Sequence, residues 1–324
     1  MSNLTINIYT KPSEMPVFSS DNPFHSAELF ALCKNTPRQT PYMIVAQDAS
    51  GAVAANMLAV VRHRSSWFPP YYYMHCRVVG EGEYRADVPQ DEVFGQMLQA
   101  LIEKLSRRVL YIEVSNLSQK MFGYRQFRQN HFFPIHWMSI HNSLHSRTPE
   151  ERISERMLQR INAAYKRGVT TETVSSEEDF TACSKLLHQH NWLKPKRYIP
   201  HDHFFRGIMT TDMGRLFVTK YHGHVIGCSV CVYSGRNAFL WYSAYRRKSY
   251  AFLHPDELTI WHAIKDAHQR GYDHIFFLDV GLPFQKNPYR EFILSFGGKP
   301  VSTYRWFHCT IGWLNRLLSW IYRD

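Results

Sequence analysis

The sequence lacks any uninterrupted apolar run of the roughly 20 residues that a helix needs to cross a bilayer. Residues 1–9 also lack a basic stretch followed by a long apolar one, so they do not resemble a secretory signal peptide. These absences argue against an integral membrane protein and against an exported one. We therefore expect a cytoplasmic protein, and peripheral contact with the inner face of the membrane stays open.

Cysteine is scarce, and the spacing of the six cysteines suggests no disulfide framework. Cys228 and Cys231 form a Cys-x-x-Cys pair inside an expected strand, where residues three apart point to opposite faces. Three His-x-His pairs, at 188–190, 201–203 and 222–224, give a weak metal signal and favour a solvated loop. We expect reduced, mostly buried thiols, as in the cytosol, and no metal ion.

Acidic residues are few relative to basic ones. The chain has 27 Asp and Glu against 38 Lys and Arg, which gives a formal net charge of +11. This balance favours an anionic partner, such as a nucleotide-bearing cofactor, an RNA or an anionic membrane surface. A basic surface that only maintains solubility is the alternative.

Low-complexity segments and long linkers are also absent. The 324 residues are enough for about two domains. A repeated order of elements is present instead: a hairpin around a glycine turn, an aromatic strand, a helix and a buried strand. The first half has these elements at 42–46, 53–61, 71–76, 93–105 and 109–114, and the second at 216–220, 225–233, 238–245, 258–268 and 275–280.

Short identities fall at matching places in these halves. Glu113 and Asp279 each precede a valine at the end of the buried strand, Gln-Lys follows six residues later, and then comes Tyr-Arg. Identity in register with the same element order indicates a duplicated unit. We predict an N-terminal domain at 1–148, a C-terminal domain at 149–308 that begins with a connecting helix at 150–168, and an amphipathic helix at 309–324.

This layout resembles that of GNAT-type acyltransferases, and the second half resembles their FemAB/CelD-like branch. The resemblance is carried by Arg160–Val169, Leu253–Leu258, Phe277–Gly281 and Tyr289–Arg290. It implies an α/β (α+β) fold of two tandem GNAT-like domains, each a mixed, mainly antiparallel sheet flanked by helices. It also implies transfer of an acyl or aminoacyl group to an amine. In the FemAB branch the donor is aminoacyl-tRNA and the acceptor a peptidoglycan precursor, and in CelD-like members the expected donor is acyl-CoA.

The GNAT phosphate loop, Arg/Gln-x-x-Gly-x-Gly/Ala, corresponds here to Arg246, Arg247, Lys248, Ser249 and Ala251. We assign these residues to the anionic donor, because cations beside a helix N-terminus form an anion site. Ser249 replaces a glycine that would let backbone N–H groups approach a pyrophosphate closely. Acyl-CoA is the expected co-substrate and no cofactor is expected to be bound permanently. A solvated basic turn is the alternative.

Asp279 and Tyr242 are the catalytic candidates. Asp279 ends the second buried strand, where a carboxylate can take a proton from the attacking amine or orient it. It can equally fix the following loop, which the matching Glu113 favours. Tyr242 lies in the aromatic strand and can protonate a leaving thiolate or hydroxyl, or be a core residue with a satisfied hydroxyl.

Four residues are candidates for substrate contact. Arg160, Tyr289 and Arg290 follow from the family resemblance. Trp192 lies in the stretch 191–203, which we expect to line the acceptor site, as loops often do.

The tail 309–323 carries Trp313, Leu314, Leu317, Leu318 and Ile321 at helical spacing. Such a helix can dock on its own sheet or lie on an anionic membrane. The leading hypothesis is transfer of an acyl or aminoacyl group from acyl-CoA or aminoacyl-tRNA to an amine of a cell-envelope or sugar-derived acceptor. A non-catalytic protein that binds an anionic ligand or membrane is the alternative. The charge makes a specifically tRNA-dependent enzyme a third hypothesis.

Overall fold

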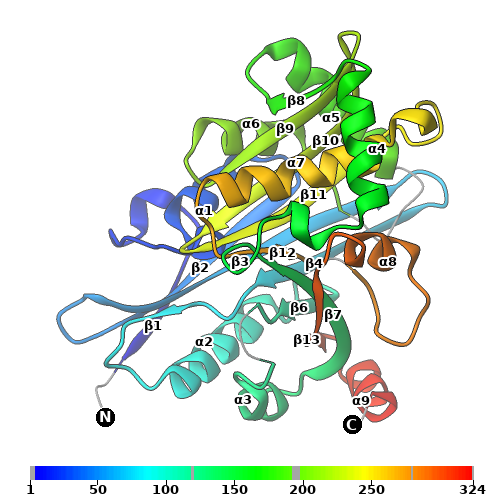
Figure 1. The fold of residues 1–324 in the computed structure, drawn as a ribbon. Helices are drawn as coiled ribbons and strands as arrows, with labels where there is room; N and C mark the ends of the chain where they lie inside the picture. The colour runs from blue at the N-terminus through cyan, green and yellow to red at the C-terminus, as the bar shows by residue number, and fades with distance from the viewer. Residues whose placement is uncertain (1–3, 118–119, 192–197, 279, 323–324) are drawn as a thin grey trace. The chain divides into compact units, whose positions relative to one another are not determined.

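The computed structural model describes residues 4–117, 120–191, 198–278 and 280–322 (Figure 1). The chain divides into two compact units. The first comprises Met1–Trp137 and Ser302–Asp324, and the second is Met138–Val301. Among the helices within the described ranges, none has the length and apolar character to cross a membrane.

The first unit is built on a sheet with the strand order β1-β2-β3-β4-β6-β13, and β5 pairs with β3. Strands β4 and β6 run parallel, and the other neighbours in this order run antiparallel. The strands are β1 Thr5–Tyr9, β2 Gln39–Gln47, β3 Val53–Ser66, β4 Tyr71–Val79, β5 Glu83–Tyr84, β6 Tyr111–Ser115 and β13 Lys299–Cys309. The helices are η1 Pro12–Glu14, η2 Pro23–His25, α1 Ala27–Asn35, α2 Gln90–Leu105, α3 Tyr124–Gln129 and α9 Gly312–Ile321.

Helix α2 forms where the sequence predicts it, because its apolar residues recur with the helical period. Val93, Met97, Leu98, Leu101 and Leu105 are all buried. They belong to one core with residues of α3 and with the sheet residues Cys76, Ile112 and Trp306. This core covers one face of the first sheet.

The second unit has the strand order β7-β12-β11-β10-β9-β8. Strands β11 and β12 run parallel, and the other neighbours run antiparallel. The strands are β7 Phe133–Ser143, β8 Val169–Thr173, β9 Gly214–Tyr221, β10 His224–Ser234, β11 Asn237–Tyr245 and β12 His274–Phe277. The helices are η3 Glu150–Arg152, α4 Glu155–Lys166, α5 Glu177–Asn191, α6 Asp202–Thr210, η4 Ala251–Leu253, α7 Pro255–Gln269 and α8 Pro288–Leu294.

Helices cover both faces of the second sheet. Helix α7 crosses β9, β10 and β11 and shares a core with α4 and α8 (Figure 1). Helices α5 and α6 cover the other face, where the Sγ of Cys228 in β10 lies 3.5 Å from the carbonyl oxygen of Cys183 in α5. The sheet of the second unit is therefore buried from both sides at its centre, as β10 shows with eight consecutive buried residues, Ile226–Tyr233.

The duplicated order of elements is confirmed. Hairpin β2–β3, strand β4, helix α2 and strand β6 recur as hairpin β9–β10, strand β11, helix α7 and strand β12. Both copies have two antiparallel pairings followed by a parallel one. The predicted connecting helix is α4. It ends before Gly168, whose φ of +90° suits the residue that follows a helix C-terminus.

The last strand of each repeat pairs outside its own repeat. Strand β7 follows α3 along the chain and pairs with β12, whereas β13 follows α8 and pairs with β6. Residues 302–324 consequently belong to the first unit and residues 138–148 to the second. The boundaries of the two compact units therefore differ from those of the domains expected from the sequence, 1–148 and 149–308.

His188 and His190, which precede the loop expected at 191–203, lie in α5, and residues 192–197 of that loop lie outside the described residues. The N-terminus of this helix has a readable signal: the Ser176 hydroxyl accepts a hydrogen bond from the N–H of Asp179, and three acidic residues fill the first turn. His201 in turn precedes α6 as its N-cap. All six cysteines are buried with free thiols.

Candidate active site

Strands β11 and β12 pair along the first half of β11 and then diverge. Their parallel ladder runs from Asn237 opposite His274 to Leu240 opposite Phe277, where β12 ends. Strand β11 continues along β10 to Tyr245, opposite Gly227. The chain after β12 instead follows β7, where the N–H of Met138 donates to the carbonyl oxygen of Gly281 at 3.1 Å. We call this divergence the strand parting.

A β-bulge lies at the strand parting. Leu240 pairs with Cys231 and Tyr242 pairs with Val230, so Trp241 is an extra residue in β11. A bulge bends its strand and increases the local twist, which turns β11 away from β12. The Trp241 ring packs edge-on against Phe204 of α6 at 5.5 Å between centroids.

Tyr242, a predicted catalytic residue, lies beside this bulge. It is 4% exposed, and its ring meets that of Phe205 at 5.5 Å and 89°. Tyr242 thus lies next to the strand parting, but its ring contact is typical of a packed core residue. A role in proton transfer stays a prediction.

The first unit has no matching parting at the ladder between its described strands β4 and β6. Their pairing runs from His75 opposite Tyr111 to Val79 opposite Ser115, the last residues of both strands. The N–H of Gly80 then donates to the carbonyl oxygen of Ser115 at 2.8 Å. Glu113, the counterpart of Asp279, is buried between Arg77 at 3.5 Å and Arg305 at 3.3 Å. The two copies thus differ where the chemistry is expected.

The predicted phosphate loop joins β11 to α7. The N–H of Tyr250 donates to the carbonyl oxygen of Arg246 at 3.1 Å, which closes the turn. Arg246, Arg247, Lys248 and Ser249 are all exposed. The structure therefore brings the cations predicted to bind the donor to the end of the strand that leaves β12.

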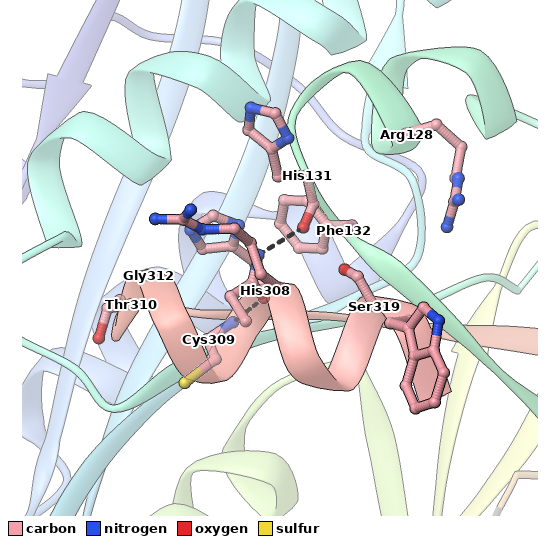
Figure 2. Close-up of a pocket in the computed structure, with 11 residues that line it drawn as sticks. Arg128, His131, Phe132, His308, Cys309, Thr310, Gly312 and Ser319 are labelled. Atoms are coloured by element: carbon pink, nitrogen blue, oxygen red, sulfur yellow. Dashed lines mark hydrogen bonds between the residues drawn. The ribbon is translucent and has the colours of Figure 1, made fainter. Parts of the chain in front are cut away.

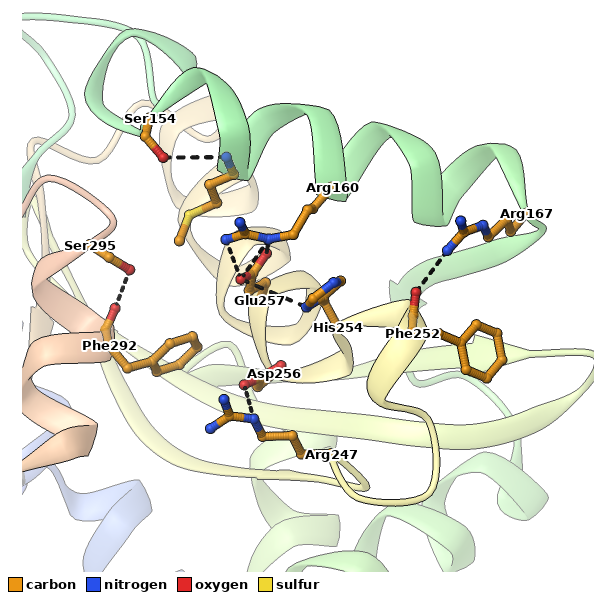
Figure 3. Close-up of polar contacts among 11 residues, drawn as sticks. Ser154, Arg160, Arg167, Arg247, Phe252, His254, Asp256, Glu257, Phe292 and Ser295 are labelled. Carbon is orange, nitrogen blue, oxygen red and sulfur yellow. Dashed lines mark hydrogen bonds and ion pairs between the residues drawn. The ribbon is translucent and has the colours of Figure 1, made fainter.

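The N-terminus of α7 already carries two carboxylates (Figure 3). Asp256 and Glu257 are 5% and 8% exposed, and Arg247 lies 3.3 Å from the Asp256 carboxylate. Burial raises the pKa of Asp256, and the nearby Arg247 opposes this shift. Acidic groups in the first turn compensate the positive end of the helix dipole. An anionic ligand is better placed at the exposed loop cations than at this helix end.

Arg160, predicted to contact substrate, pairs with Glu257 (Figure 3). Its Nε lies 3.0 Å from Oε2 and its Nη2 lies 2.6 Å from Oε1, a bidentate arrangement. The hydrogen bond to Glu257 raises the pKa of Arg160. Nearer the end of α4, Arg167 donates to the carbonyl oxygen of Phe252 at 2.8 Å. Both arginines thus tie α4 to the segment that follows the predicted phosphate loop.

Arg160→Gln is expected to lower the free energy of unfolding by about 2 kcal/mol, because Glu257 stays largely buried without its bidentate partner. Urea denaturation measures the change. Arg156→Gln, an exposed arginine of the same helix, is the matched control and should change it by less than about 0.5 kcal/mol. A variant at Arg160 that keeps full stability but raises the KM of a substrate would instead support the predicted binding role.

Arg290 and Asn287 fix the loop after β12. The Arg290 guanidinium donates to the carbonyl oxygens of Leu282 and Gln285, each at 2.6 Å. The Asn287 amide donates to the carbonyl oxygen of Val280 at 2.8 Å, and its Oδ1 accepts the N–H groups of residues 289 and 290. Sequence reasoning missed Asn287, although an Asn-Pro pair before a helix is an N-cap signal.

The other predicted site residues have different positions. Tyr289 lies in α8, half-buried against the core of the second unit, and its ring is 6.5 Å from that of Phe292. Ala251 begins the 3-10 turn η4. Asp279 and Trp192 lie outside the described residues. Within the described part of the chain, no group of three or more His, Cys, Asp or Glu side chains is arranged to hold a metal ion.

Comparisons with known proteins agree with this architecture. Residues 153–286 match the family described as the acetyltransferase (GNAT) domain. The structure of FemX is similar with a TM-score of 0.60 and 11% identity, over 89% of this chain and 97% of FemX. The C-terminal domain of a putative lysylphosphatidylglycerol synthetase from Agrobacterium fabrum has a TM-score of 0.59 and 11% identity, over 92% and 91% of the two chains.

A tandem GNAT protein from the clavulanic acid biosynthesis pathway has a TM-score of 0.54 and 9% identity, over 87% of each chain. A search of curated protein sequences finds no match. At such identities, structural likeness shows the fold alone, and the sequence match at residues 153–286 lies within the second unit. Residues 153–286 thus match the GNAT domain family, and over most of its length the chain has the FemAB-like fold of tandem GNAT proteins.

Proposed function

We propose that the protein is an N-acyltransferase that moves an acyl or aminoacyl group to an amine, with its reaction centre at the strand parting. The observation that carries the proposal is the divergence of β11 from β12 after Leu240 and Phe277, with a bulge at Trp241. Along the part of β11 that no longer pairs with β12, backbone N–H groups point at the carbonyl oxygen of a donor bound beside the strand. Such donors stabilise the oxyanion that develops when an amine attacks.

The proposed reaction is a direct transfer. The amine nitrogen forms a bond to the donor carbonyl carbon, and the carbon–sulfur bond of a thioester or the carbon–oxygen bond of an ester breaks. The amine loses one proton, for which Asp279 is the proposed acceptor, and the leaving group gains one, for which Tyr242 is the proposed donor. Holding both substrates in one site supplies much of the rate enhancement, without a covalent enzyme intermediate.

The donor is proposed to be an acyl-CoA or an aminoacyl-tRNA, because both carry phosphates that suit Arg246 and Lys248. Ser249 in place of glycine, together with Asp256 and Glu257 at the start of α7, disfavours a pyrophosphate held by that helix end. This combination favours the tRNA donor, as does the net charge of +11. An amine of a cell-envelope or sugar-derived molecule is the proposed acceptor.

The double variant Arg246→Gln/Lys248→Gln is expected to raise the KM of the donor about tenfold or more with little change in kcat, because two exposed cations are lost from a phosphate contact. Mass spectrometry of the product, with acetyl-CoA, longer acyl-CoAs and charged tRNA as donors, provides the measurement. Lys166→Gln removes an exposed cation from α4 and serves as the control. An unchanged KM, or failure of all these donors to bind, would refute the proposal.

A non-catalytic binding protein is the second candidate. It is favoured by Ser249 and by the two carboxylates at the N-terminus of α7, which together make an ordinary CoA site poor. This candidate predicts salt-dependent binding of RNA or anionic vesicles that survives Asp279→Ala and Arg246→Ala, with no product from any donor.

A further inference from the structure

Helix α9 has its apolar residues on the outside. Trp313, Leu317, Trp320 and Ile321 are 68%, 45%, 65% and 54% exposed. Their spacing places them on one stripe of the helix, together with the exposed Arg316. A surface helix normally turns such a stripe towards its own core. The opposite orientation therefore needs a physical explanation.

A buried asparagine, Asn315, fixes this orientation. Asn315 is 6% exposed; its Oδ1 accepts the N–H of Cys309 at 2.8 Å, and its Nδ2 donates to the carbonyl oxygen of His131 at 2.9 Å. The Tyr322 ring stacks on Phe133 at 5.7 Å. Turning the apolar stripe inward would break these contacts and leave the N–H of Cys309 and the carbonyl oxygen of His131 without the Asn315 side chain, which is costly. These contacts thus hold the apolar stripe on the outside of the first unit.

The surface beside this stripe is positively charged. Arg128 of α3 and Arg316 of α9 line a cavity of about 560 Å³ with His131, His308 and Ser319 (Figure 2). The sequence contains no Asp or Glu between residues 114 and 149 or between 292 and 322, the stretches that supply this cavity. An apolar stripe rich in tryptophan and flanked by arginines matches the chemistry of an anionic lipid surface.

We propose that α9 is an interfacial membrane helix, which inserts Trp313, Leu317, Trp320 and Ile321 among the lipids and holds Arg128 and Arg316 over the headgroup phosphates. The helix has 10 residues and is about 15 Å long, so it lies in the interface and does not span the bilayer. A two-fold contact between copies of this chain fits less well, because the same patch would meet itself and bring like charges together. This membrane contact does not depend on the proposed transfer reaction.

The test is co-sedimentation of the full chain with vesicles of phosphatidylcholine, alone or with roughly a third phosphatidylglycerol. We expect binding to the anionic vesicles only, weakened by salt. The variant Trp313→Ser/Leu317→Ser/Trp320→Ser should lower the partition coefficient about tenfold or more. Arg128→Gln/Arg316→Gln should lower it about tenfold and reduce the salt dependence. All five side chains are exposed, so we expect unchanged folding by circular dichroism.

The matched control is Trp67→Ser/Phe68→Ser, which removes two aromatic side chains that are 92% and 82% exposed between β3 and β4 of the same unit. It should bind vesicles as the unchanged protein does. Absence of binding to anionic vesicles, or equal binding by the α9 triple variant, overturns the proposal. An equal loss of vesicle binding in the control also overturns the proposal, because binding would then be due to exposed aromatic side chains in general. A dimer that the triple variant converts to monomers would assign the stripe to a second copy.

Discussion

Asp279→Asn is expected to lower kcat for acyl transfer by about a hundredfold or more, with little change in the KM of the donor. The amide keeps the size of the side chain but cannot accept the proton of the attacking amine. Asp279 itself lies outside the described residues, and the strand before it, β12, ends at the buried residue Phe277, where it parts from β11. Single-turnover measurements of the transfer step separate this effect from substrate binding.

Glu113→Gln is the matched control, because Glu113 lies in β6, the corresponding strand of the first unit. It is 6% exposed and contacts Arg77 and Arg305. Loss of its charge leaves two arginines without this counter-ion, so we expect a decrease of about 3 kcal/mol in the free energy of unfolding. The kcat per folded molecule should stay the same. If Asp279→Asn retains full kcat, Asp279 has a structural role like that of Glu113.

The first unit is expected to lose stability steeply as the pH falls below about 6, because two of its buried histidines resist protonation. Burial lowers the pKa of His25 from 6.5 to about 3. Its ring nitrogens face the N–H groups of Leu58 at 3.1 Å and Gly82 at 3.0 Å, so an imidazolium would face two donors. Burial also lowers the pKa of His75 to about 3, with a further contribution from the neighbouring arginines 62, 64 and 77.

The direction of the pH effect follows from these lowered values. Well above pH 6.5 both histidines are neutral in the folded and in the unfolded chain, and the full stability is present. Between about pH 6 and 4 the unfolded chain takes up two protons that the folded chain does not. The free energy of unfolding should then fall by roughly 2.7 kcal/mol per pH unit.

Urea unfolding at a series of pH values measures this slope. His75→Gln should remove about half of it, because one of the two protons is no longer taken up on unfolding. His224→Gln, at an exposed position of β10, should leave the slope unchanged. Equal slopes for the unchanged protein and the His75 variant would contradict the explanation.

Features encoded by neighbouring residues could be predicted from the sequence. The spacing of Val93, Met97 and Leu101 marks α2, and Gly51 and Gly223, both with positive φ, mark the two hairpins. The repeat was readable because both copies keep the same order of strands and helices. The basic loop after β11 was also found, since its cations follow one another in the chain. Each of these signals depends on contacts between residues close in sequence.

Pairings between distant residues could not be predicted in this way. Arg160 was assigned to substrate contact from the family resemblance, and a basic residue on a helix carries no mark of its partner, which here is Glu257, 97 positions later. The bulge at Trp241 depends on the register of β10, and Asn287 acts through the carbonyl oxygen of Val280. The exchange of β7 and β13 between the repeats likewise has no local signal.

The sequence by itself determined that this protein has two copies of one strand-and-helix unit, a basic loop in the second copy and an amphipathic helix at its end. Tertiary structure decided that β11 and β12 part only in the second copy, that Arg160 binds Glu257, and that α9 turns its tryptophans outward. The physical reason is that periodicity and turn chemistry act between neighbours in the chain, whereas strand register, ion pairs and the burial of Asn315 depend on groups that only folding brings together.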